Sequence, residues 1–266
     1  MRTRLILAIT LAALAAVRVS AHDFWLAAVN WVPGDGAPMA LTAGLGERFP
    51  ARTTFRPNGK WLAEWRLIGA DGEVPAGEFR LGALAMQAEI PVPAAGAFMG
   101  VARVNAQLTE MTGEAFTEYL KEERLQHIIA FREVFGESGL IATERFYRFA
   151  KVAVRNGSGP GAHLTRPAGL LAEFVPEADP TSIRPGAPLT VQLLVNGSPV
   201  ANAPVSAVSD SAVVDAHTDG EGRATFAIDR PGAWMIRTVY MVRLPPEDHA
   251  EWESYWATLV FHTAAR

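Results

Sequence analysis

The residue types best suited to chemistry begin with His22, which follows a segment typical of an export signal. Residues 1–21 start with positive charge, continue with an apolar run at 5–17 and end in small residues, the three-part pattern of a cleavable signal peptide. Cleavage after Ala21 would give His22 a free α-amine beside its imidazole Nδ1, and the two nitrogens can close one chelate ring on a metal ion. Nitrogen donors favour nickel, cobalt, copper and zinc over calcium and magnesium. We therefore expect His22 to bind a divalent transition metal.

A second group of metal-ligand residue types lies at Asp215, His217 and Asp219. Residues two apart in an extended strand share a face, so these three side chains could form one row of ligands. The alternative is a solvated polar edge before a turn, in which Asp219 has a structural role of its own. His249 is a further candidate ligand from the C-terminal region.

The composition excludes several other classes of function. The chain has 266 residues, 24 of them basic and 28 acidic, and no cysteine. Removal of residues 1–21 takes away three arginines and no acidic residue, which leaves 21 basic and 28 acidic residues, a net charge of about −7. This balance argues against a nucleic-acid-binding protein. The lack of cysteine excludes iron–sulfur clusters, thiol nucleophiles and disulfide scaffolds, and an exported chain without disulfides fits the bacterial periplasm.

No motif for phosphate binding or hydrolysis has the context it needs. The loop at 157–162 (GSGPGA) fits a dinucleotide-binding pattern, but Pro160 prevents the helix that must follow. Walker, zinc-protease and serine-hydrolase motifs do not occur. Glu122 and Glu123 are neighbours in an expected helix and point to different faces, so we interpret them as a solvated surface rather than a catalytic pair. The sequence predicts no enzyme.

The elements that must position these residues are mostly β-strands. Short alternating segments separated by glycine- and proline-rich turns predict strands throughout 22–103. A charged stretch with apolar residues at helical spacing predicts one or two helices over 114–135, which Thr112 can cap and Gly136 can close. No later apolar run reaches about 18 residues, so we expect no membrane insertion after processing.

Proline-rich sequence between 167 and 187 indicates a domain boundary, after which Asn196-Gly197 predicts a β-hairpin. We expect an all-β protein of two immunoglobulin-like β-sandwich domains. The first covers residues 22–167 and contains the helical insertion, and the second covers residues 168–266.

The sequence resembles bacterial secreted proteins of the domain-of-unknown-function family 4198. The resemblance covers nearly all of the mature chain, and the order of its motifs is more specific than any one of them. The motifs are Ala21-His22-Asp23-Phe24-Trp25-Leu26, Glu144-Arg145-Phe146-Tyr147-Arg148-Phe149-Ala150-Lys151, Asn196-Gly197-Ser198-Pro199-Val200, Thr218-Asp219-Gly220-Glu221-Gly222, Pro231-Gly232-Ala233-Trp234 and Tyr255-Trp256-Ala257-Thr258-Leu259.

The resemblance implies a periplasmic protein, and some relatives are associated with nickel or cobalt uptake. It does not imply any enzyme activity. Nickel-linked relatives carry further histidines near the first glycine-rich turn, whereas this chain has none at 44–49 (GLGERF). Our leading hypothesis is an accessory protein that binds nickel, cobalt or copper through His22 and has a metal-uptake membrane transporter as its partner. One alternative is an interaction module that binds an envelope protein or a glycan. Another is a copper oxidase, which would require a second histidine beside His22.

Overall fold

The computed structural model describes residues 22–31, 39–46, 49–50, 61–81, 86–90 and 95–264. The predicted signal peptide at residues 1–21 lies outside these residues, as do the glycine- and proline-containing segments 33–36 (PGDG) and 57–59 (PNG). Among the described residues, no helix has the length and apolar character needed to cross a membrane.

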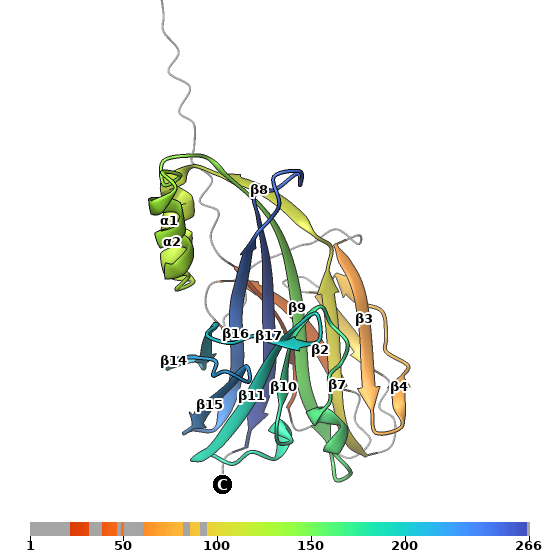
Figure 1. Cartoon of the computed structure of the whole chain (residues 1–266). Coiled ribbons are helices and arrows are strands. Elements are labelled where there is room, and N and C mark those ends of the chain that lie inside the picture. Colours follow the sequence, from red (N-terminus) through yellow and green to blue (C-terminus); the bar gives the residue numbers. More distant parts are fainter. Residues whose placement is uncertain are drawn as a thin grey trace, which may run out of the picture.

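Three sheets form the body of the molecule (Figure 1). The first sheet has the order β1-β2-β6-β5, with β1 (Asp23–Ala28), β2 (Met39–Gly46), β5 (Arg80–Leu81) and β6 (Met86–Ile90). The central sheet has the order β14-β13-β16-β17-β9-β7-β3-β4, and β8 pairs with β9. Its strands are β3 (Leu62–Gly69), β4 (Gly72–Val74), β7 (Gly96–Val104), β8 (Gln107–Met111), β9 (Ala142–Asn156), β13 (Pro204–Val208), β14 (Val213–His217), β16 (Gly232–Arg243) and β17 (Trp252–Thr263).

The C-terminal sheet consists of β10 (Ala172–Pro176), β11 (Ala187–Val195), β12 (Ser198–Pro199) and β15 (Arg223–Ile228). Two 3-10 turns, η1 (Ala162–Thr165) and η2 (Pro180–Ser182), lie near its start. The expected hairpin at Asn196-Gly197 is confirmed: both residues have positive φ, and Val195 pairs with Ser198 on the other side of the turn.

The central sheet separates two apolar cores. Neighbouring residues of β7 point to opposite faces, so Phe98 packs with the first sheet, whereas Ala97 and Met99 pack with the C-terminal sheet. Each expected sandwich is thus one outer sheet packed on a central sheet that the two share. The parallel pairing of β17 with β9 joins them, and the boundary between 167 and 168 stays a prediction.

The expected helical insertion is confirmed as α1 (Gly113–Glu122) and α2 (Gln126–Val134). Thr112 caps α1, because its Oγ1 accepts the N–H of Ala115 at 3.2 Å. The helices cover the face of the central sheet that also carries the first sheet. They bury Phe116 and Leu120 against Trp252 and other side chains of β16 and β17 in a third apolar cluster, the helix core.

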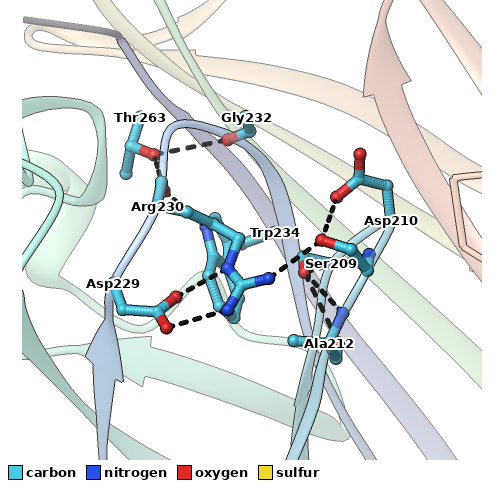
Figure 2. A network of polar contacts seen from close by, with 9 residues as sticks. Ser209, Asp210, Ala212, Asp229, Arg230, Gly232, Trp234 and Thr263 are labelled. Carbon is cyan, nitrogen blue, oxygen red and sulfur yellow. Dashed lines mark hydrogen bonds and ion pairs between the residues drawn. The ribbon is translucent and has the colours of Figure 1, made fainter.

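Polar contacts hold neighbouring strands and sheets in place. At the turn into β16, the carbonyl of Arg230 accepts hydrogen bonds from Trp234 Nε1 at 3.2 Å and Thr263 Oγ1 at 2.9 Å (Figure 2). This arrangement sets the start of β16 against the end of β17. Between sheets, the buried Lys151 Nζ of β9 lies 2.7 Å from Glu173 Oε2 of β10, so an ion pair links the central and C-terminal sheets.

Candidate functional site

A band of charged side chains crosses the central sheet between the helix core and the core of the first sheet. The band comprises Asp23 of β1, Glu123 and Arg124 at the end of α1, Arg148 of β9, Asp215 of β14 and Arg237 of β16. The neutral Ser206 of β13 links Arg124 to Asp215 through hydrogen bonds. Burial of charge is costly unless each group is paired. The partner of each charged group therefore shows which strands and helices the band connects.

The beginning of β1 is attached to the central sheet by two guanidinium groups. Arg148 Nε donates to the carbonyl oxygen of His22 at 3.1 Å, and Arg237 Nε donates to Asp23 Oδ1 at 2.7 Å. One residue further on, Thr258 Oγ1 donates to the carbonyl oxygen of Phe24 at 2.7 Å. Three consecutive residues, His22 just before β1 and the first two residues of β1, are thus bound by three neighbouring strands.

The guanidinium of Arg148 is itself held by aromatic rings. It lies 4.5 Å from the ring centre of Phe146 and 5.3 Å from that of Trp256. Burial lowers the pKa of Arg148, but an arginine side chain keeps its proton in a folded protein. The donor that holds His22 is therefore a fixed cation.

Arg237 also binds the helical insertion. Its second nitrogen lies 2.5 Å from Glu123 Oε2, so one guanidinium joins β1, β16 and α1. Burial raises the pKa of Glu123 to about 7, although the charge of Arg237 lowers it and that of Asp23 raises it further. Burial lowers the pKa of Arg237, but its two carboxylates outweigh this and raise it overall. The interpretation of Glu123 as a solvated residue is wrong, because the chain turns after α1 and directs this side chain onto the sheet.

A second buried network lies beside the helix core. Tyr119 donates to Glu144 Oε1 at 2.9 Å, and Ser254 donates to the same oxygen. The ring of Tyr119 stacks on Trp256 with centres 5.9 Å apart. Burial raises the pKa of Glu144 and raises that of Tyr119 well above its usual value. Because Ser254 is fully buried, this network binds α1 to the sheet rather than presenting a reactive hydroxyl to solvent.

The predicted row of ligands is interrupted in the structure. β14 ends at His217, and Asp219 lies in the following turn, where its carboxylate accepts the N–H groups of Glu221 at 3.0 Å and Arg223 at 2.8 Å. Asp215 accepts from Ser206 Oγ at 2.7 Å and lies 3.6 Å from Arg124. The turn thus engages Asp219, and the cation of Arg124 engages Asp215. Metal ligation by this row of residues stays a prediction.

His249 lies in the exposed turn between β16 and β17. Figure 1 shows that this turn is at the end of the two strands opposite the C-terminus. Within the part of the chain that the structure describes, no three side chains of His, Asp or Glu gather closely enough to hold a metal ion between them. The predicted ligands are therefore not brought into one site of side chains.

Comparison with known families identifies the chain. The model of the family described as "Domain of unknown function (DUF4198)" matches residues 19–242, which is most of the sequence. The chain belongs to this family. No curated protein matches it significantly.

The DUF4198 chain is also similar to solved structures of low identity. The D0-D1 domain of Intimin has 15% identity and a TM-score of 0.22, with 91% of this chain and 98% of the other covered. The fibronectin(III)-like modules of Clostridium thermocellum CbhA have 10% identity and a TM-score of 0.22, with coverage of 90% and 93%.

Sequence reasoning did not find the residues that organise this DUF4198 site. Arg148 shares a strand face with Phe146 and Ala150, and Arg237 shares one with Met235 and Val239. A charged residue in an apolar-facing position of a buried strand must have a partner. That rule was sufficient to mark both arginines. It did not name the carbonyl oxygen of His22 as the partner of Arg148, or Asp23 and Glu123 as the partners of Arg237.

Proposed function

We propose that this protein is an exported accessory protein without enzymatic activity, which binds nickel, cobalt or copper through His22 and passes it to an uptake transporter. The observation that carries the proposal is the attachment of His22 and Asp23 to the central sheet through Arg148 and Arg237. After cleavage at Ala21, the new N-terminus would begin at this fixed point.

The donor set suits a transition metal. The α-amine and Nδ1 of a terminal His22 would supply two nitrogens from one residue, and water or a partner would complete the coordination. Such a chelate needs no cluster of side chains, so it is compatible with the lack of one among the described residues. Imidazole and amine nitrogens suit nickel, cobalt and copper, whereas calcium and magnesium require oxygen ligands.

The anchoring supports binding through preorganisation. A free chain end loses conformational entropy when it closes on a metal ion, and this loss subtracts from the affinity. Here the backbone of His22 is already fixed by a guanidinium that lies against two aromatic rings. An open position left by a two-nitrogen chelate also permits transfer to a second set of ligands, as delivery requires.

Calorimetry with nickel and copper on the correctly processed protein tests this proposal. One added glycine before His22 removes the amine from the chelate ring and leaves the imidazole as a lone donor. We expect the affinity to fall by more than the 10–100-fold typical of changes beyond the ligands themselves. His22→Ala should have a similar effect.

His127→Ala is the matched control, because it removes an exposed histidine at the start of α2. This variant should bind as the wild type does. The double variant Asp215→Ala/His217→Ala separates the second candidate site from the first. Equal affinity with and without the added glycine would contradict the proposal, and loss of binding only in the Asp215 and His217 variant would move the site to β14.

A further inference from the structure

The helical insertion ends in an exposed apolar surface. Nine large apolar side chains are exposed in the described part of the chain, and five of them lie within residues 131–141. We call these five the hairpin patch: Phe131, Val134, Phe135, Leu140 and Ile141. Val134 is 79% exposed and Phe135 is 64% exposed. Single exposed apolar residues are ordinary, but a group of this size on one feature is typical of an interaction site.

The hairpin patch is held in place from beneath. The buried Arg132 donates to the carbonyl oxygens of Glu137 at 2.5 Å and Leu140 at 2.9 Å, which fixes the loop after α2 against the helix. Phe131 packs edge-on against Trp252 with ring centres 5.9 Å apart. The patch is therefore a preorganised surface, which lowers the entropic cost of binding.

Three acidic residues lie on α2, α1 and β8, the segments next to the patch. Glu133 lies between Phe131 and Val134 in α2 and is exposed. Glu114 lies in the first turn of α1, whose first residue is in contact with the loop at 138–139. Glu110 of β8 pairs with Thr143, two residues after the patch ends.

These carboxylates are not neutralised by neighbours. Glu110, Glu114 and Glu133 are exposed, and within the described residues none of the three forms an ion pair. The one exposed lysine of the two helices, Lys121, is already paired with Glu118 at 2.7 Å. Arg243 lies 5.9 Å from the ring centre of Phe131, but it is already paired with Glu137 at 2.9 Å and Glu251 at 3.6 Å. The net charge at the rim of the patch is thus negative.

We propose that the hairpin patch docks a protein surface that is apolar at its centre and rimmed by lysine or arginine, such as one face of a basic amphipathic helix. Complementary charge favours such a partner. Two other occupants would bring like charges together: an anionic lipid surface, and a second copy of the chain pairing patch to patch. This proposal does not depend on metal binding at His22.

The test uses a fluorescent 18-residue amphipathic helix of Leu and Lys, with a Leu and Glu helix of the same pattern as its counterpart. Fluorescence anisotropy should show the Lys peptide binding the wild type and the Glu peptide not binding. Val134→Glu/Phe135→Glu should weaken the Lys peptide at least tenfold. This change adds negative charge, so attraction by charge alone would instead strengthen binding.

Val213→Glu/Val214→Glu is the matched control, because it adds the same charge at two exposed valines of β14. It should leave binding unchanged. Charge reversal at the rim, Glu114→Lys/Glu133→Lys, should weaken the Lys peptide and allow the Glu peptide to bind. Circular dichroism of each variant confirms that it is folded.

Three results would overturn the proposal. One is equal loss of Lys-peptide binding in the β14 control. Another is patch-dependent binding to vesicles of phosphatidylcholine and phosphatidylglycerol, which would indicate a lipid surface. The third is a dimer in sedimentation that Val134→Glu/Phe135→Glu dissociates, which would assign the patch to a second copy.

Discussion

Glu123→Gln should change how the stability of the protein depends on pH. Glu123 is only 6% exposed and shares the guanidinium of Arg237 with Asp23. Its pKa is about 7 in the folded protein, against an ordinary value of 4.5 in the unfolded chain. Because the folded state holds this proton more tightly, the wild type loses stability as pH rises through the window from 4.5 to about 7.

The size of the effect follows from the same two values. The difference between 4.5 and about 7 corresponds to a loss of about 3 kcal/mol across the window, since each pH unit is worth about 1.4 kcal/mol. Glutamine keeps the shape of the protonated acid and does not titrate. The free energy of unfolding of Glu123→Gln, relative to the wild type, should therefore rise by about 3 kcal/mol between pH 4 and pH 8.

Urea unfolding at several pH values measures this difference, because titrating groups that do not interact with Glu123 contribute equally to both proteins and cancel. Glu122→Gln is the matched control: this neighbour is exposed and its charge makes only the smallest contribution to the raised pKa of Glu123, so its substitution should give a difference that varies far less with pH. A constant difference for Glu123→Gln would refute the reasoning, since it would mean that Glu123 is ionised in the folded protein over the whole range.

Three further predictions concern contacts described above. Lys151→Met should destabilise the protein by about 3–5 kcal/mol in urea unfolding, because it leaves the buried Glu173 without its cation, and adding Glu173→Gln should recover part of the loss. Thr112→Ala should cost about 1 kcal/mol by removing the helix cap, again measured by urea unfolding. Arg148→Met should increase hydrogen exchange at residues 22–28 and weaken nickel binding at His22 in calorimetry, whereas unchanged exchange would contradict its role as the anchor of β1.

The local features of the fold were predictable from the sequence. Thr112 as a helix cap and Asn196-Gly197 as a hairpin are confirmed because each depends on a few adjacent residues. The sharing of one central sheet was not predictable. It depends on the parallel pairing of β17 with β9, which lie more than 90 residues apart, and alternating polarity does not specify a partner strand.

The candidate site was predictable only in part, for the same reason. The sequence marks His22 through the segment before it, but the groups around it come from three distant elements. Glu122 and Glu123 show the limit clearly, because the same residue type at adjacent positions is exposed in one case and buried in the other. The end of α1 decides between them, because Glu122 is the last residue of the helix and Glu123 lies where the chain turns toward the sheet.

We infer that the charged band fixes the position of β1 rather than adding to the stability of the fold. Buried ion pairs contribute little net stability, because desolvation offsets their attraction, but breaking one is costly. A slip of β1 by one residue would turn Asp23 to the opposite face and leave Arg237 with only Glu123. The pair of Asp23 with Arg237, together with the bond from Arg148 to His22, therefore fixes the register of β1 and with it the place where a processed chain would begin. A metal chelate at the terminus needs such a fixed place, whereas an apolar contact at the same position would allow the strand to slide.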